Sequence, residues 1–184
     1  MESYLESLLS QKSYNKSHNI ALDFDGVIAK KPRDTSIKVF ETFDRLLGKC
    51  KLVGIMYRLL YEPLSLNGRK PNEEFIKALN GRPVHILTTN SEHVKENIRK
   101  YAENAGLSVK EVYALPPGKR EEREKYGWIN AKLQELIPVI YVTDDSKVSE
   151  YINGRQPQIN IVHLQNGQNA STNNPKIGYF KYLI

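Results

Sequence analysis

At 184 residues, the chain is long enough to bury the core of one domain, with room for an insertion, without disulfides or structural metal. Hydrophobic residues make up 40% of the sequence and charged residues 26%, which is ordinary for a soluble globular protein, and no run approaches the roughly 18 apolar residues of a membrane span. The formal net charge of +6 fits a solvated, lysine-rich surface and also permits attraction to phosphorylated metabolites, nucleotides or nucleic acid.

The first 80 residues are expected to form one strand and several helices. A short apolar run at 20–24, bounded by polar residues, predicts a buried strand. Apolar residues at helical spacing predict helices at 2–9, 36–47, 52–61 and 71–79. Pro71 is well placed as the first residue of the last of these helices.

From residue 84 onward, predicted strands alternate with predicted helices. Apolar runs indicate strands at 84–87, 109–115, 139–142 and 159–164, with an edge strand at 177–183. Helices are expected at 91–104, capped by Ser91, and at 121–136 and 146–152. This alternation predicts an α/β fold with a Rossmann-like parallel sheet of about five strands, covered by helices on both faces. Ligands bind such sheets at the carboxyl ends of the strands.

Two acidic residues leave the end of the first predicted strand in the sequence Asp23-Phe24-Asp25-Gly26. Such a pair suits a hard divalent cation, because Mg²⁺ takes about six oxygen ligands in octahedral geometry. The Asp23 carboxylate and the Asp25 backbone carbonyl could each supply one oxygen. Asp and Gly also favour turns, so the same residues are equally compatible with a plain turn.

A second acidic pair, Asp144-Asp145, follows the predicted strand at 139–142. If the two strands are neighbours in the sheet, Asp144 can supply a third oxygen to the same cation. The cation would offset the repulsion between the carboxylates and an incoming phosphate dianion. A free oxygen of Asp23 could then attack phosphorus, and Asp25 could donate and later accept a proton.

Polar residues also follow the predicted strand at 84–87, in the sequence Thr88-Thr89-Asn90. A hydroxyl at this place, near the start of a helix, suits a phosphate oxygen, and the sequence leaves Thr88 and Thr89 as alternatives. A lysine between the third and fourth strands would complete the charge balance of a phosphate site. Lys119, Lys125 and Lys132 lie in that interval.

The order of these motifs resembles the haloacid dehalogenase superfamily over about residues 19–165. The matching segments are Asp23-x-Asp25-Gly-Val, Thr88-Thr89-Asn90, a lysine, and Thr143-Asp144-Asp145. The second acid of the first motif is typical of the phosphatase branch. The resemblance therefore implies a Mg²⁺-dependent phosphomonoester hydrolase that forms an aspartyl-phosphate on a small phosphorylated metabolite or nucleotide.

The resemblance also implies roles for individual residues. Asp23 would be the nucleophile, Asp25 the general acid and base, and Asp144 and Asp145 the acids that anchor Mg²⁺ together with the first pair. Thr88 or Thr89, with Asn90, would bind the phosphate. Lys125 would be the stabilising lysine, with Lys119 as the alternative because it follows the third strand more closely. Residues 124–129 also resemble a short segment of the 5'(3')-deoxyribonucleotidase group.

The segment at 31–70 looks like the small helical cap that such enzymes insert after the first strand. The expected domains are therefore a core at 1–30 and 71–184 and a cap at 31–70. In this family the cap contacts the leaving group, and the candidates here are Tyr57, Arg58 and Tyr61. The basic balance permits a phosphatase for nucleic-acid ends, although no aromatic-interleaved basic stripe favours it. A binding protein without turnover is the remaining alternative.

Several other sites are excluded by composition and spacing. The single cysteine, Cys50, rules out an internal disulfide and a multi-cysteine zinc site. The four histidines have no metal-ligand spacing, and His85 is expected to be a packed strand residue. The first residues contain Glu2 and Glu6 and no apolar run typical of a signal peptide. We therefore expect a cytoplasmic protein without a membrane segment, of undetermined oligomeric state.

Overall fold

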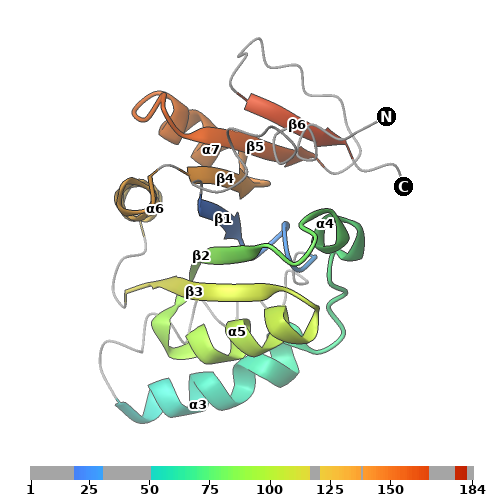
Figure 1. Cartoon of the computed structure of the whole chain (residues 1–184). Helices are drawn as coiled ribbons and strands as arrows, with labels where there is room; N and C mark the ends of the chain where they lie inside the picture. Colours follow the sequence, from blue (N-terminus) through green and yellow to red (C-terminus); the bar gives the residue numbers. More distant parts are fainter. Residues whose placement is uncertain (1–18, 31–50, 117–120, 138, 166–176, 182–184) are drawn as a thin grey trace.

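The protein contains one parallel sheet, seen in the computed structural model as a stack of strands from β6 to β3 (Figure 1). The structure describes residues 19–30, 51–116, 121–137, 139–165 and 177–181. Six strands lie in the order β3-β2-β1-β4-β5-β6, and every neighbouring pair is parallel. They are β1 (Asn19–Asp23), β2 (Pro83–Ser91), β3 (Ser108–Leu115), β4 (Val139–Thr143), β5 (Asn160–Gln165) and β6 (Ile177–Lys181).

Helices connect these strands and cover both faces of the sheet. They are α3 (Lys51–Tyr61), the π-helical turn η1 (Glu62–Leu66), α4 (Glu73–Ala78), the short η2 (Glu92–Val94), α5 (Lys95–Asn104), α6 (Glu122–Glu135) and α7 (Ser146–Asn153). The predicted Rossmann-like α/β class is confirmed, with the expected edge strand present as β6. No helix in the described part of the chain is long and apolar enough to cross a membrane.

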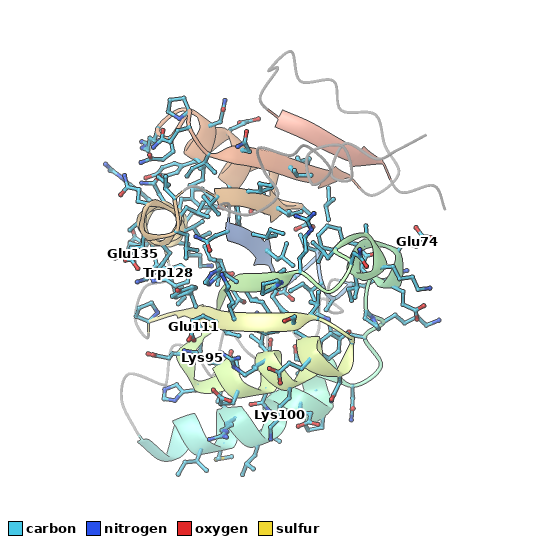
Figure 2. All side chains as sticks on the ribbon, viewed as in Figure 1. Glu74, Lys95, Lys100, Glu111, Trp128 and Glu135 are labelled. Atoms are coloured by element: carbon cyan, nitrogen blue, oxygen red, sulfur yellow. The ribbon has the colours of Figure 1, made fainter. Side chains whose placement is uncertain are left out.

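The apolar residues of the central strands divide between the two faces of the sheet, because successive side chains of a strand point in opposite directions. On one face, Ile20 and Leu22 pack with residues of α3, α4 and α5, including Phe75 and Ile98. The opposite face has its own cluster, which includes Ala21, Leu87, Tyr141 and Ile161 with Trp128, Ile129 and Leu133 of α6 and Val148 and Ile152 of α7. Trp128 is labelled in Figure 2. Burying one such large side chain stabilises the fold by about 1.5–3 kcal/mol.

Two local predictions are wrong. Pro71 does not begin a helix but forms an isolated bridge with Ala29, and α4 starts at Glu73. Ser91 does not cap a helix: it is the last residue of β2, which runs past the predicted end of the strand. Its hydroxyl is buried without a hydrogen-bond partner among the described residues.

Other expectations are confirmed or fall outside the described residues. His85 is buried in β2 and stacks on Tyr113, as expected of a packed residue, and burial lowers the pKa of its imidazole. The predicted helices at 2–9 and 36–47 lie outside the described residues, as does Cys50.

The strand order determines where a ligand would bind. From β1 the chain builds the sheet in one direction, through β2 and β3, and then returns to place β4 on the other side of β1. A crevice forms outside the carboxyl ends of the strands at such a reversal, and α/β proteins bind ligands there. Asp23 is the last residue of β1, and Asp144 directly follows β4. The two acidic pairs therefore flank this reversal point.

Candidate active site

The turn after β1 is held by its own backbone and by buried apolar side chains. The N–H group of Gly26 donates to the carbonyl of Ala29 at 2.8 Å, and the N–H groups of Ile28 and Ala29 both donate to the carbonyl of Phe24 at 3.1 Å. Phe24, Val27 and Ile28 are fully buried. Apolar burial and hydrogen bonds therefore hold Asp25 in one place beside the end of β1.

Gly26 brings the first acidic pair close to the second. Its φ is +82°, in the left-handed region that favours glycine. A Cβ atom added at Gly26 would overlap the carboxylate group of Asp144. The backbone of the turn therefore lies directly against this carboxylate, and only a residue without a side chain permits so close an approach.

Asp23 lies between these groups in an electrostatically unfavourable position. Burial, followed by the negative charges of Asp144 and Asp25, raises the pKa of the Asp23 carboxyl well above its usual range. The Thr143 hydroxyl opposes this shift by donating a 3.1 Å hydrogen bond to Asp23 Oδ2. The carboxylates thus lie close enough to repel one another, and a cation would relieve that repulsion.

Asp25 is contacted at each of its two oxygens, by a hydrogen bond at Oδ2 and by an ion pair at Oδ1. Asn90 Nδ2 donates to Asp25 Oδ2 at 2.7 Å, and Arg69 Nη2 lies 2.7 Å from Asp25 Oδ1. Asn90 also donates from Nδ2 to Thr88 Oγ1 at 2.9 Å and from its backbone N–H to the same oxygen at 3.1 Å. Thr88 and Asn90 at the end of β2 therefore lie in direct contact with the site of Asp25.

The two threonines of this segment differ in their surroundings. Thr88 is almost completely buried, and its hydroxyl oxygen accepts the two hydrogen bonds from Asn90. Thr89 is half-buried on the same strand and therefore points to the opposite side of the chain. The structure thus joins Thr88, rather than Thr89, to the Asn90–Asp25 contact.

Asp145 has a structural role, as a helix cap, that the sequence did not suggest. Its Oδ1 atom accepts hydrogen bonds from the backbone N–H groups of Lys147 at 2.9 Å and Val148 at 3.2 Å, so Asp145 is the N-cap of α7. Its own N–H donates to Thr143 Oγ1 at 3.2 Å. The cap thereby fixes the backbone that carries Asp144.

Of the two candidate lysines, Lys125 and Lys119, the structure describes only Lys125. Lys125 is half-buried in α6, three residues after the start of the helix at Glu122. Glu122, the first residue of α6, lies 3.3 Å from Lys147 of α7, so this end of α6 lies beside the start of α7, which Asp145 caps. Lys119 lies outside the described residues.

Arg69 is a site residue that sequence reasoning missed. It lies just before α4, and only 6% of its side chain is exposed although it carries a charge. Tyr61 of α3 also comes close: burial and then the charge of Asp25 raise the pKa of its phenol, and Arg69 opposes that shift. Tyr57 is buried and stacks on Tyr61 with ring centroids 6.0 Å apart, whereas Arg58 is exposed. The sequence signal that could have pointed to Arg69 is the presence of a basic residue shortly before Pro71.

The donor set fits a hard divalent cation that keeps several waters. No group of three or more His, Cys, Asp or Glu side chains within the described ranges is arranged as a complete metal site. Mg²⁺ does not require one, because it usually binds through one or two carboxylates and completes its shell with water and substrate oxygens. The contact of Asp144 with Gly26 places the Asp144 carboxylate beside the turn that joins Asp23 to Asp25, and the charges of Asp144 and Asp25 raise the pKa of Asp23.

Comparison with known proteins finds a similar fold but no sequence match. No protein-family model matches the sequence, and no curated protein matches it. The UTR4 protein (unknown transcript 4 protein) of Saccharomyces cerevisiae has a similar structure, with a TM-score of 0.51, 12% identity, and coverage of 90% of this chain and 97% of that chain. A haloacid dehalogenase-like family hydrolase from Streptococcus pneumoniae has a TM-score of 0.48 and 14% identity, covering 80% of this chain and 84% of that chain. The likeness to UTR4 shows a shared fold.

Proposed function

We propose that the protein is a Mg²⁺-dependent phosphomonoester hydrolase that acts on a small phosphorylated metabolite or nucleotide. One observation carries this proposal: the Asp144 carboxylate lies directly against Gly26, in the turn that follows Asp23, at the reversal point of the sheet. An acidic cluster held by backbone and buried apolar groups is costly unless a cation is expected there. A turn that binds no cation would not need carboxylates gathered in this way.

The residues that would hold Mg²⁺ are Asp23 and Asp144 through their carboxylates and Asp25 through its backbone carbonyl. When bound, the ion would neutralise charge on the transferring phosphoryl group and act as a Lewis acid. Asp145 was expected as a further ligand. We now assign it the supporting role of capping α7 and orienting Asp144, because its Oδ1 atom is occupied by two backbone N–H groups.

Asp23 is the proposed nucleophile. One of its oxygens attacks phosphorus in line, a new O–P bond forms, and the bond between phosphorus and the leaving oxygen breaks. The Thr143 hydrogen bond to Asp23 Oδ2 orients the carboxylate and favours its ionised form. The product of this step is an aspartyl-phosphate on Asp23.

Asp25 is the proposed proton carrier. It gives a proton to the leaving oxygen in the first step, which releases an alcohol. In the second step it takes a proton from a water that attacks phosphorus, the Asp23–phosphorus bond breaks, and inorganic phosphate leaves. The same carboxyl group therefore returns to its starting state after each turnover.

Thr88 and a lysine complete the proposed phosphate site. We favour Thr88 over Thr89 because Thr88 contacts Asn90, which contacts Asp25. Lys125 is the favoured lysine, since it belongs to the end of α6 beside the start of α7, which Asp145 caps, and Lys119 remains the alternative. Comparing Lys125→Met with Lys119→Met in phosphate release would separate the two assignments.

The test of the function is phosphate release by purified protein with Mg²⁺ from p-nitrophenyl phosphate and a panel of small phosphomonoesters. Activity that requires Asp23 would support the proposal, and a folded protein inert across the panel would contradict it. An end-phosphorylated oligonucleotide in the same panel tests the nucleic-acid alternative. Hydrolysis of that substrate should then fall steeply with salt, because contacts to the phosphate backbone release counterions.

A further inference from the structure

We propose that Arg69 is the positioning residue for Asp25: it sets the direction from which Asp25 delivers a proton to the leaving group. This inference rests on the proposed function and deepens it. It concerns a residue outside the four motifs, which comes from the segment that returns the insertion at 31–70 to the core.

Arg69 binds the turn after β1 at several points. Its Nε donates to the carbonyl of Lys30 at 2.6 Å, and its Nη2 donates to the carbonyl of Ala29 at 3.1 Å. The guanidinium carbon lies 5.3 Å from the centre of the Phe24 ring, in cation–π geometry. The same Nη2 lies 2.7 Å from Asp25 Oδ1. Every one of these partners belongs to the segment 24–30 that carries Asp25.

These contacts lock the position of the guanidinium before it meets Asp25. Tyr101 adds a further restraint, because its hydroxyl donates to the Arg69 backbone carbonyl at 3.1 Å. With only 6% of the side chain exposed, solvent screens the ion pair weakly. A planar guanidinium fixed at Nε and Nη2 presents its donor in one direction, which a flexible lysine ammonium does not do.

The two contacts on Asp25 together define the orientation of its carboxyl plane. Arg69 pairs with Oδ1 at 2.7 Å through charge, without hydrogen-bond geometry, and Asn90 donates to Oδ2 at 2.7 Å from the carboxyl end of β2. A carboxyl group held at one oxygen only could rotate, whereas one held at both cannot rotate without breaking a contact. General acid catalysis depends strongly on such placement, since the proton must lie within hydrogen-bond reach of the leaving oxygen.

A purely structural role is the competing explanation, because Arg69 also ties the insertion to the turn. One feature argues for more than tethering: Arg69 Nη1 is buried and has no hydrogen-bond partner among the described residues. An arginine selected only for stability would be expected to have its buried donors satisfied. The two explanations predict different responses to the leaving group.

The experiment measures kcat and kcat/KM on aryl phosphates whose phenols differ in basicity, from p-nitrophenyl phosphate to phenyl phosphate and p-methoxyphenyl phosphate. A p-nitrophenolate departs readily as an anion, whereas the more basic phenolates depend on protonation. The variants are Arg69→Met, Arg69→Lys, Asp25→Asn and the double variant Asp25→Asn with Arg69→Met. Thermal melting of each variant checks its fold.

We expect Arg69→Met to lower kcat/KM, which reports the step in which the alcohol departs, by less than about 10-fold on p-nitrophenyl phosphate and by about 100-fold on the most basic leaving group, the range for loss of a general acid. In the Asp25→Asn background, Arg69→Met should add less than about 3-fold, because Arg69 acts through Asp25. Arg69→Lys keeps the charge but loses the fork, so its dependence on the leaving group should be intermediate. If Arg69→Met does not fold, Arg69→Lys provides the test.

Arg99 offers a matched control outside the site. This partly buried arginine of α5 pairs with Glu103 and Glu111 at 3.6 Å and donates to the carbonyl of Val109 at 3.3 Å. Glu111 also pairs with Lys95 at 2.6 Å, and both are labelled in Figure 2 between β3 and α5. Arg99→Met should change stability without changing the leaving-group dependence.

Two results would overturn the inference. If Arg69→Met and Arg69→Lys lower kcat/KM by the same factor on every leaving group, Arg69 is structural. If the effects of Arg69→Met and Asp25→Asn are fully additive, Arg69 does not act through Asp25. A wild type inert on the whole series would instead overturn the proposed function, and this inference with it.

Discussion

The Thr143 hydroxyl of β4 donates a hydrogen bond to the Asp23 carboxylate of β1 at 3.1 Å, which links the two strands on either side of the reversal point. Thr143 is completely buried, and the same oxygen accepts the N–H group of Asp145 at 3.2 Å. One side chain therefore connects the candidate nucleophile to the backbone of the second acidic pair. It is a small contact between residues that lie 120 positions apart in the sequence.

Replacing Thr143 by valine should weaken the nucleophile without disturbing the packing. Valine has nearly the same shape, but it removes a hydrogen bond to a carboxylate, which contributes about 1.5–3 kcal/mol. The pKa of Asp23 should rise further, because the hydroxyl is the group that lowers it. We expect kcat to fall about 10-fold or more at neutral pH, in line with that energy. Thr143→Ser retains the hydroxyl and should retain most of the activity, and equal losses in the two variants would contradict this role.

Gly26→Ala tests the close approach of the turn to Asp144. The substitution imposes strain at a positive φ, about 1–2 kcal/mol, and adds the overlap with the Asp144 carboxylate, about 1–3 kcal/mol more. Gly68 is the matched control, because its φ is +78° and a Cβ there meets nothing within 4 Å. Denaturant unfolding should give a larger loss for Gly26→Ala than for Gly68→Ala. Equal losses would mean that the contact with Asp144 is not tight.

Asp23 should make the metal-free protein less stable at neutral pH. Its folded-state pKa is raised, so its contribution to the free energy of unfolding is fully present below the unfolded pKa near 3.9 and is lost as pH rises through the folded pKa. Asp23→Asn removes the buried charge and should therefore raise Tm at pH 7 in EDTA, by about 2–4 °C for each kcal/mol gained. Adding Mg²⁺ should stabilise the wild type more than the variant. A lower Tm for Asp23→Asn in EDTA would show that the acidic cluster is not strained.

Thr88→Val and Thr89→Val separate the two candidate phosphate ligands. Thr88 Oγ1 receives two hydrogen bonds from Asn90, so its loss should both weaken phosphate binding and release Asn90 from Asp25. We expect kcat/KM to fall about 10-fold or more in Thr88→Val, since a lost hydrogen bond to a charged group costs about 1.5–3 kcal/mol, and to change less than about 3-fold in Thr89→Val. Inhibition by inorganic phosphate provides an independent measure of binding. The reverse order of effects would assign Thr89 instead.

The fold was largely predictable because its strands are short, apolar and bounded by polar residues. Strands β1 and β4 are recognisable in this way, and the alternation of strands with helices determines a parallel sheet. The placement of both acidic pairs at strand ends follows from the same pattern. Local motifs and topology together were sufficient to bring Asp23 near Asp144.

The rest of the site depends on contacts that have no local sequence pattern. Arg69 reaches the carbonyl of Ala29, 40 positions away, only because the segment before α4 lies against the turn after β1. Ser91 looks like a helix cap in sequence, but β2 continues through it, since pairing with Leu115 of β3 extends the strand. Asp145 could equally have been a ligand or a cap, and the start of α7 decides for the cap.

The most direct test of the central claim is phosphate release from p-nitrophenyl phosphate and the phosphomonoester panel, measured for the wild type and for Asp23→Asn with and without Mg²⁺. We predict Mg²⁺-dependent turnover by the wild type, loss of turnover to background in a folded Asp23→Asn variant, and loss of wild-type turnover in EDTA. A wild type inert across the panel, or an Asp23→Asn variant that keeps full activity, would contradict the assignment of Asp23 as the nucleophile of a phosphatase.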